Sequence, residues 1–534
     1  MTHLMFQRCV HLIFLIAILL FLPAFGQYVR QEKFASEQDR RARYELDDWI
    51  SHSTSHSFSS ATIGTHYLYI ATKDGGILRY HILENYWDFP FTTSSGLPSN
   101  TVLDVYYDPE TGFLWAITPN DISIFQPASK EWINKSETPG WPYDLPERDT
   151  SGTQPANSDQ INRGVFFNRE ALLNLPTFFA NGSFSILSDW RLSDDNTFDE
   201  YLMVGYIRDR FDRIWFLVDG FGIGQGDMFS QRADFYRIGL PDISPRAIEF
   251  QGDDLWIGGV GDRRGISGIA LWPYNSAEWE YFQAKRIARL PSDNVFSMLA
   301  DGDSIWFASD FGVSLFEYGD LNWKNYSTRE GMASNEVNDL AIVNDYLYAA
   351  TQQGISRISL LTGNLEKTKD KRFINLPVYR FALQSDTLWA GTSRGIFRRL
   401  PDTSEWEFVP SRASIQDLEI TAVGTFEDEI WFASTGGVTL YEQKSDKWQS
   451  FPQLAFEISP PYNDIKVNES AAWVATDTGL LKYDKQRNYW RLFTTEDGLL
   501  DNHCHQLLLD GDFIWIVTDK GITEFYWNSP QRSD

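Results

Sequence analysis

The feature that most constrains the fold is a repeat of about 42 residues. An aromatic residue stands two or three positions before an Ala/Gly-Thr/Ser step, as in DEIWFASTGGVTLY at residues 428–441. Between residues 256 and 515 these aromatic residues are separated by 50, 42, 41, 42, 42 and 42 positions. The eleven anchors are Tyr69, Trp115, a degenerate Phe178, Trp215, Trp256, Trp306, Tyr348, Trp389, Trp431, Trp473 and Trp515. Such a fixed period predicts a repeat architecture.

Each unit has the pattern of four short antiparallel strands. In the unit that begins at residue 335, the ranges 337–343, 346–351 and 354–359 are the first three strands, and the fourth strand of many units carries a tryptophan. Glycine recurs where the second strand turns into the third, because that turn needs a positive φ without a Cβ clash. Four strands in each unit of 40–45 residues are typical of a β-propeller. We therefore expect an all-β propeller of about eleven four-stranded modules.

The two ends of the chain complement each other. The last unit has three strands, at 503–509, 513–518 and 521–527, and lacks a fourth. Residues 45–50 (ELDDWI) resemble a fourth strand with no unit before it. We predict that this N-terminal strand completes the last unit and closes a ring, which removes an exposed sheet edge. The sequence leaves open one large ring or two fused rings.

The N-terminus has the pattern of a secretory signal peptide. Arg8 and His11 precede the apolar run 12–22, and Ala24-Phe25-Gly26 places small residues at a cleavage site. The run is too short for a spanning helix, and no later segment is apolar for long enough. We expect a signal peptide at 1–26, a leader at 27–43, propeller repeats at 44–527 and a tail at 528–534. The alternative is an uncleaved anchor. A periplasmic or secreted location follows from the cleaved signal peptide.

Charge and cysteine content exclude some functions. The net charge of −27 disfavours binding to nucleic acid and to anionic lipid surfaces. After cleavage a single cysteine, Cys504, remains, so no internal disulfide is possible. A chain of this length buries a sufficient core without one.

A second motif joins the units and carries a family resemblance. GLPSNTV at 96–102, LPSDNV at 290–295, GMASNEV at 331–337 and GLLDN at 498–502 lie between the fourth strand and the next first strand. Together with the Trp-x-Ala/Gly-Thr/Ser-x-x-Gly core, they resemble the two-component-regulator propeller repeat. That repeat forms periplasmic sensors of hybrid histidine kinases, many of which respond to polysaccharide fragments. No kinase or DNA-binding segment follows here. The start of the propeller also looks like the propeller subunit of the type IX secretion system, without its C-terminal domain.

The irregular face of the predicted ring carries the first candidate site. Residues 135–162 interrupt the period with an insertion rich in Pro, Gly, Ser and Thr, which is typical of a tolerated surface loop or of a functional lid. A glycine-rich turn at 258–265 and the next connection supply the basic corner, Arg263, Arg264, Lys285, Arg286 and Arg289. A basic group on an acidic protein suits an anionic ligand such as an acidic glycan. The alternative is a solvated loop.

Histidines near the closing seam are the second candidate. His52 and His56 follow the N-terminal strand, whereas His503 and His505 begin the last unit. In a single ring His56 and His503 would be neighbours near the pore, so we consider a transition-metal site at His56, His503 and His505. The alternative is ordinary polar lining of the channel, and no cofactor is otherwise expected.

Motifs of enzymatic propellers are missing. The chain has no Ser-x-Asp-x-Gly-x-x-Trp box, no Ala-x-Asp-x-x-Thr-Gly-x-x-x-Trp repeat and no Gly-x-Ser-x-Gly elbow.

We expect an exported, non-catalytic propeller that binds a glycan-like ligand or scaffolds an envelope complex. Its partner is an anionic glycan or an envelope protein. A polysaccharide-acting hydrolase or lyase is the alternative.

Overall fold

The computed structural model describes residues 37–144, 169–261, 268–273, 279–367, 370–401, 405–410, 418–451, 458, 460–530 and 532. The predicted signal peptide, most of the leader, positions 145–162 of the insertion, and Arg263 and Arg264 lie outside the described residues. The described part is built mainly of strands, and its helices are short: they include α2 (Arg169–Leu172) and the 3-10 helices η1 (Thr93–Ser95), η2 (Lys135–Glu137) and η4 (Lys371–Phe373). The prediction of an all-β propeller is confirmed.

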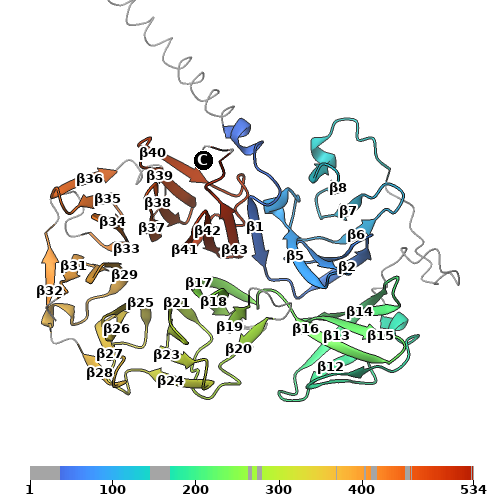
Figure 1. Cartoon of the computed structure of the whole chain (residues 1–534), viewed down its shortest axis with the longest axis horizontal. Coiled ribbons are helices and arrows are strands. Elements are labelled where there is room, and N and C mark those ends of the chain that lie inside the picture. Colours follow the sequence, from blue (N-terminus) through green and yellow to red (C-terminus); the bar gives the residue numbers. More distant parts are fainter. Residues whose placement is uncertain are drawn as a thin grey trace, which may run out of the picture.

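Seven of the sheets form a closed ring (Figure 1). Their innermost strands contact one another in cyclic order, and the last contacts the first. These first strands are β17 (Ile243–Gln251), β21 (Val295–Asp301), β25 (Val337–Val343), β29 (Val378–Gln384), β33 (Ile420–Phe426), β37 (Tyr462–Val467) and β41 (Cys504–Asp510). The second strands are β18 (Asp254–Gly261), β22 (Ser304–Ser309), β26 (Tyr346–Thr351), β30 (Thr387–Thr392), β34 (Glu429–Ser434), β38 (Ala471–Thr476) and β42 (Phe513–Thr518).

The outer half of each ring sheet completes an antiparallel meander. The third strands are β19 (Ile269–Trp272), β23 (Gly312–Glu317), β27 (Gly354–Ser359), β31 (Gly395–Arg399), β35 (Gly437–Glu442), β39 (Gly479–Asp484) and β43 (Gly521–Tyr526). The fourth strands are β20 (Glu280–Phe282), β24 (Asn322–Tyr326), β28 (Leu365–Lys367), β32 (Trp406–Val409), β36 (Lys447–Phe451), β40 (Tyr489–Phe493) and β1 (Trp49–Ser53). Gly312 illustrates the predicted turn: its φ is 106°, and a Cβ there would lie 2.0 Å from the Tyr326 carbonyl oxygen.

The repeated aromatic residues form the core between neighbouring sheets. Each second strand is buried along most of its length, and Trp431 is a fully buried example. Trp431 packs on Phe451 of its own sheet, with ring centroids 5.9 Å apart, and on Tyr483 of the next sheet, 5.5 Å away. Burial of an aromatic residue contributes more apolar area than that of any aliphatic residue. The 42-residue period therefore repeats the inter-sheet contact.

The N-terminal strand closes the ring, as predicted. Strand β1 pairs antiparallel with β43, in the order β1-β43-β42-β41. The Trp49 ring stacks on Phe525, with centroids 3.7 Å apart and planes 9° apart, and Trp49 is 2% exposed. The last sheet therefore obtains its fourth strand from the other end of the chain.

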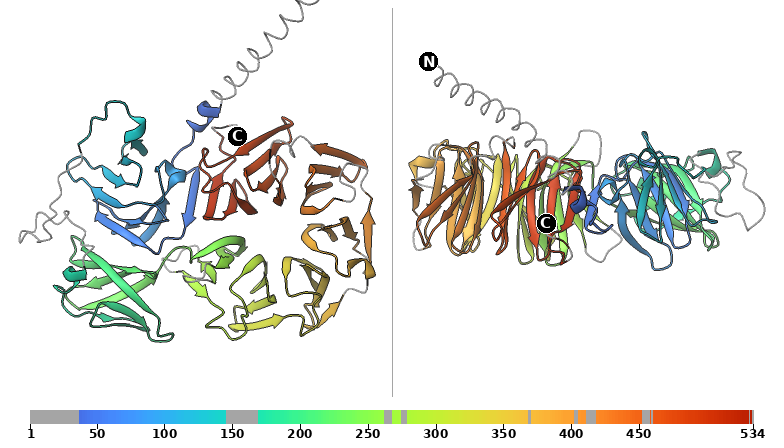
Figure 2. Two further views of the ribbon diagram at one scale, coloured as in Figure 1. Left: turned by 180° about the vertical axis from the view of Figure 1, so that it is seen from behind. Right: turned by 90° about the horizontal axis from the view of Figure 1, so that it is seen from above.

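Three further sheets form a separate three-sheet unit. The first sheet contains β2 (Phe58–Ile63), β3 (Tyr67–Thr72), β4 (Ile77–His81) and β5 (Tyr86–Phe91). The second contains β6 (Asp104–Tyr107), β7 (Leu114–Ile117), β8 (Ile122–Gln126) and β9 (Glu131–Asn134). The third contains β10 (Phe179–Ala180), β11 (Phe184–Ile186), β12 (Arg191–Asp194), β13 (Glu200–Arg208), β14 (Arg213–Asp219), β15 (Gly222–Asp227) and β16 (Arg232–Arg237). The β2–β5 sheet contacts both of the others, through β6 and through β13. Figure 2 shows the unit beside the ring.

The anchor Phe178 does not begin a module of its own. It directly precedes β10, which pairs with β16 in the sheet that also contains Trp215, and its ring lies 5.2 Å from Phe216. In the same sheet β11 and β12 cover the inner edge of β13. The described residues therefore form ten sheets, with seven in the ring and three beside it. The reason is that this segment extends an existing sheet instead of folding into a new meander.

Two neighbouring segments connect the ring with the three-sheet unit. Residues 54–57 lead from β1 to β2, and residues 238–242 lead from β16 back to β17. Thr54 and Leu240 form a parallel bridge, and the Thr54 hydroxyl donates to the Pro241 carbonyl at 3.3 Å. Within the part described, no helix has the length and apolar character needed to cross a membrane.

Replacement of Trp49 tests the closure. Trp49→Ala should lower the free energy of unfolding by about 3–5 kcal/mol, because a fully buried tryptophan joins the two ends of the chain. Tyr489→Ala, which removes a half-exposed aromatic residue from the fourth strand of the neighbouring sheet, is the matched control. Urea denaturation followed by tryptophan fluorescence measures both. Equal effects of the two substitutions would contradict the closure.

Candidate functional site

The inner strands of the ring are joined by a recurring side-chain-to-backbone bond. The third residue of one inner strand accepts a hydrogen bond from the backbone N–H of the next. Asp339 accepts from Phe381 N at 2.7 Å, and Asp464 accepts from Leu507 N at 3.0 Å. These two carboxylates of the inner strands therefore have a structural partner, and each bond satisfies a backbone donor.

A second bond repeats one residue earlier. The side chains of Asn338, Thr421 and Asn463 donate to the first carbonyl of the next inner strand, each at 2.7 Å. Neighbouring inner strands are therefore linked by two polar contacts in addition to the apolar core. Such fully paired polar groups fix the relative positions of the sheets.

Arg380 reaches across the channel from β29. Its Nε donates to the Asn463 carbonyl on β37 at 3.2 Å, and Nη1 donates to the Asn338 carbonyl on β25 at 3.4 Å. Asp339 lies 3.8 Å from the guanidinium. Strand β25 belongs to the neighbouring sheet and β37 to the sheet after next, so this one side chain connects three sheets.

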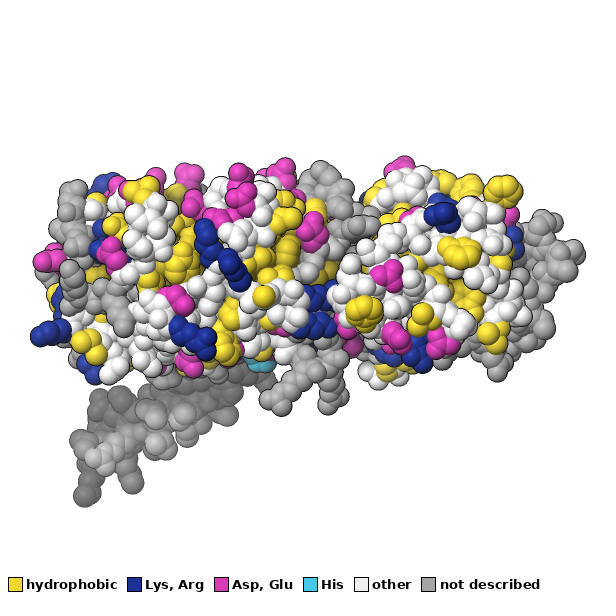
Figure 3. Space-filling view, turned by 90° about the horizontal axis from the view of Figure 1, so that it is seen from below, with side chains coloured by type: hydrophobic (Ala, Val, Ile, Leu, Met, Phe, Trp, Pro, Cys, Tyr) yellow, Lys and Arg dark blue, Asp and Glu magenta, His cyan; other side chains and the backbone are white. Residues whose placement is uncertain are grey.

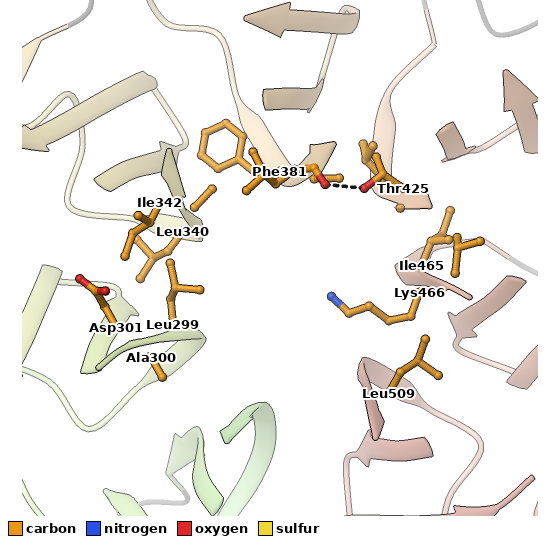
Figure 4. A pocket seen from close by; sticks show the side chains of 16 residues that line it. Leu299, Ala300, Asp301, Leu340, Ile342, Phe381, Thr425, Ile465, Lys466 and Leu509 are labelled. Carbon is orange, nitrogen blue, oxygen red and sulfur yellow. Dashed lines mark hydrogen bonds between the residues drawn. The ribbon is translucent and has the colours of Figure 1, made fainter. Parts of the chain in front are cut away.

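A channel cavity of about 410 Å³ lies within the ring, between the ends of the inner strands (Figure 4). Most of its lining side chains are apolar, among them Leu299, Leu340, Phe381 and Leu509. Lys466 projects into the cavity from β37 (Figure 4), and its Nζ lies 3.7 Å from the nearest carboxylate oxygen, on Asp464. That distance exceeds a hydrogen bond. The ammonium is therefore the principal polar group directed into the cavity.

Glu249 is a titratable group in the electrostatic field of Lys466. Burial raises the pKa of the Glu249 carboxyl to about 7, although the Ala300 N–H and the charge of Lys466 oppose the shift. The Ala300 N–H donates to Glu249 Oε1 at 3.3 Å. This carboxyl is therefore partly protonated at neutral pH, and it loses its proton as the pH rises through the physiological range.

At the seam, Asp519 collects groups from the last and first ring sheets. It accepts from Arg246 at 2.6 Å and from Ser244 at 3.0 Å, and His505 Nε2 lies 2.9 Å away. Burial would raise the pKa of Asp519, but the ion pair with Arg246 and the bond with His505 lower it well below its usual range. Burial and the charge of Arg246 lower the pKa of His505. Asp519 is thus an ionised bridge across the seam.

The predicted histidine group is divided. His503 Nδ1 lies 3.8 Å from Asp519, so His503 and His505 both approach one carboxylate. His56 is buried at the crossing between ring and three-sheet unit, 6.3 Å from the Tyr281 ring, and burial lowers its pKa to about 4. Among the described residues, no three metal-ligating side chains come together. A metal site at these histidines stays a prediction.

The described members of the basic corner have partners. Lys285 lies 3.2 Å and Arg286 2.7 Å from the Asp199 carboxylate of the three-sheet unit, and Arg289 donates to the Trp323 carbonyl at 3.3 Å. The two pairings with Asp199 connect the ring with the unit, and Figure 3 shows basic side chains where the two meet. An anionic ligand would compete with Asp199 for these groups. Binding at Lys285, Arg286 and Arg289 stays a prediction.

The inward direction of Lys466 and the burial of Glu249 were not predicted from the sequence. Each is a charged residue within the apolar first strand of a unit, in NDIKV and RAIEF respectively. That interruption was the available signal. It gives no direction for the side chain, because a bulge near the start of these strands shifts the alternation of faces.

Comparisons with known proteins reach the fold only. No family model matches the chain, and no curated protein matches it. Similar solved structures include extracellular domains of the hybrid two component systems BT4673 and BT3049 from B. thetaiotaomicron. They are 13% and 15% identical, cover 90% and 91% of this chain and 70% and 77% of their own, and have TM-scores of 0.44.

A third similar structure is PorZ, a surface component of the type IX secretion system of Porphyromonas gingivalis. It is 13% identical, covers 90% of this chain and 87% of its own, and has a TM-score of 0.32. These structures are of the two kinds that the repeats resemble. At such identities and TM-scores their functions do not transfer to this chain.

The pKa of Glu249 predicts a pH dependence of stability. The folded protein binds a proton at Glu249 between about pH 4.5 and 7 where the unfolded chain has released it, so the free energy of unfolding falls as pH rises through this window. In Glu249→Gln the free energy of unfolding should no longer fall with pH for this reason. Because the group is partly exposed, we expect this contribution to amount to about 2 kcal/mol at pH 8. Urea denaturation at pH 5 and pH 8 measures the difference. An unchanged difference between the two pH values would refute the assignment.

Proposed function

We propose that the protein is an exported, non-catalytic β-propeller that binds an anionic, glycan-like ligand in the channel cavity, as a sensor module of the cell envelope. The supporting observation is the Lys466 ammonium, which extends into a cavity whose lining side chains are mostly aliphatic or aromatic. Its Nζ lies 3.7 Å from the Asp464 carboxylate, beyond hydrogen-bond distance. A cavity of about 410 Å³ lies in the size range of small-molecule sites.

The chemistry of the cavity favours an anionic group. A carboxylate or sulfate of a ligand would meet the ammonium away from bulk water, where a charge-assisted hydrogen bond is strongest. Leu299, Leu340 and Phe381 would contact the apolar faces of the same ligand. The negative charge of ionised Glu249 would weaken the binding of an anionic ligand, so we expect tighter binding below pH 7.

The environment of the channel carboxylates supports a non-catalytic role. Asp339 and Asp464 each accept a hydrogen bond from a backbone N–H of the next inner strand, which holds these carboxylates in place. A general acid or nucleophile needs freedom to exchange protons or bonds with the substrate. The export of the chain rests on the pattern of residues 1–26. An envelope protein docking on the ring is the second kind of partner that we propose.

Glu249 supports the alternative of a polysaccharide-acting hydrolase or lyase. A carboxyl with a pKa of about 7 is in the range of a general acid, and it lies in the electrostatic field of Lys466. Glu249→Gln separates the two functions. Turnover of an acidic polysaccharide that is lost in this variant would establish the enzyme and overturn the non-catalytic proposal.

The binding test uses the mature chain and a panel of acidic and neutral oligosaccharides in isothermal titration calorimetry. Lys466→Ala should raise the Kd for an acidic oligosaccharide about 10- to 100-fold, the value of one charge-assisted hydrogen bond. Lys466→Arg should retain most of the affinity because it keeps the positive charge. The control is Lys444→Ala, which removes an 82% exposed lysine on the outer rim of the ring with the same change in charge.

The outcomes decide the location and the ligand class. Equal affinity in Lys466→Ala and Lys444→Ala would exclude the channel cavity, and loss in Lys285→Ala or Arg286→Ala would then place the ligand at the basic corner. Equal binding of neutral and acidic oligosaccharides would contradict the anionic ligand.

A further inference from the structure

A second cavity lies where the ring meets the three-sheet unit. This junction pocket measures about 630 Å³ and is lined from both parts. The ring contributes β1, β43 and the residues Trp272 and Trp279, and the three-sheet unit contributes β4 and β5. Strands β1 and β5 lie side by side at its border (Figure 1). The volume is typical of a small-molecule site between two folded units.

Aromatic side chains dominate the wall of the junction pocket. From the ring, Trp272 and Trp279 stack with centroids 4.9 Å and planes 12° apart. From the three-sheet unit, β5 contributes Tyr86, Trp87 and Phe89. Rings from two separate parts of the molecule therefore surround one space.

The described residues that line the junction pocket provide no positive charge at neutral pH. The His52 ring meets Trp272 edge-on at 4.7 Å, and burial lowers the pKa of His52 to about 4, so it is uncharged at neutral pH. Among the described lining residues none is Lys or Arg. Asp88 lines the pocket too, but it pairs with Arg79 at 3.2 Å and accepts from Tyr67 at 2.9 Å.

The second acidic residue that lines the pocket is Glu524, which has no partner among the described residues. It stands on β43 directly opposite Ile50 of β1, and paired residues in a sheet project from the same face. Phe525 and its partner Trp49 project to the opposite face, toward the core. No hydrogen bond or ion pair of the Glu524 carboxyl occurs within the described residues. Burial, and secondarily the charge of Asp510, raises its pKa to about 7.

The same position holds a cation in four other sheets. The residue on the third strand opposite the repeated aromatic residue is Arg79, Arg357, Arg398 or Lys482. Lys482 Nζ lies 5.0 Å from the centre of the Trp473 ring, and the Arg398 guanidinium 5.8 Å from that of Trp389. In the last sheet the residue opposite Trp515 is Glu524. In the other five sheets that the structure describes, this residue is uncharged: Ile124, Gln225, Leu271, Leu315 or Leu440. Glu524 is therefore the one acidic residue at a position that otherwise holds a cation or an uncharged residue in the described sheets.

We propose that the junction pocket binds a small organic cation, with its ammonium group between the aromatic rings and the Glu524 carboxylate. The faces of tryptophan and tyrosine attract ammonium groups, and a partly desolvated carboxylate supplies the opposite charge. The ligand would replace the cation that the chain itself provides in the sheets of Arg398 and Lys482. This inference does not depend on the function proposed for the channel cavity.

Ionisation of Glu524 makes the binding depend on pH. The other titratable groups that face or approach it are His52, Tyr86, Asp88 and Asp510, and His52 remains neutral above pH 5. Because the competent form is the ionised carboxylate, the Kd should fall about 10-fold or more between pH 5.5 and pH 8. In Glu524→Gln this dependence should disappear.

The test measures binding of choline to the mature chain by calorimetry and by tryptophan fluorescence. Propylammonium tests whether a primary amine suffices, and 3,3-dimethyl-1-butanol is the uncharged isostere of choline. Glu524→Gln should raise the Kd for choline at least 10-fold at pH 8. The matched control is Glu366→Gln, which removes a carboxylate that pairs with Arg357 in another sheet.

A charge-reversal variant keeps the test independent of folding. Glu524→Lys should supply the cation that four other sheets carry at this position, so the variant should fold with an unchanged or higher Tm and should not bind choline. Binding of the uncharged isostere or of a neutral sugar as tightly as choline would overturn the cation proposal. Absence of choline and propylammonium binding to the unmodified chain would overturn it too.

Discussion

The pairing of β1 with β43 is the contact on which the whole arrangement depends. A ring of sheets has one position where the chain does not continue from one sheet to the next. Here that position is closed by a strand from the opposite end of the chain, with Trp49 stacked on Phe525. Between this last sheet and the first sheet of the ring, Gln506 Oε1 accepts a hydrogen bond from the backbone N–H of Ile248 at 2.8 Å. Closure of a loop of several hundred residues costs little more than closure of a short one, so buried contacts at the seam can offset it.

The same closure explains why the molecule has two parts. After β1 completes the ring, the chain leaves to build the three-sheet unit and returns at residues 238–242, beside its point of exit. The unit is held against the ring by the pairing of Arg286 with Asp199 and by the wall of the junction pocket. Both proposed sites follow from this layout: one within the ring, where Lys466 lies, and one between the parts, where Glu524 lies.

The sequence predicts the strands and the seam well, because the aromatic period and the turn glycines are local signals with a physical cause. The division into seven and three sheets was left open, since a 42-residue interval is the same whichever ring the sheet joins. Phe178 was misread because one aromatic residue does not distinguish a new meander from an added edge strand. The partner of Arg286 is 87 positions away in the chain, so its pairing with Asp199 was out of reach. The surroundings of Lys466 and Glu249 could not be predicted either, because they depend on the direction in which a single side chain points.

Disulfide formation between β1 and β43 tests the seam most directly. Ser51 and Thr523 are paired in register, and their hydroxyl oxygens lie 2.8 Å apart. In the double variant Ser51→Cys and Thr523→Cys, mild oxidation should join the two thiols within one molecule, and mass spectrometry of proteolytic fragments should find the two segments linked. If both introduced thiols stay free in the folded, oxidised protein, in addition to Cys504, the closure of the ring by the N-terminal strand is contradicted.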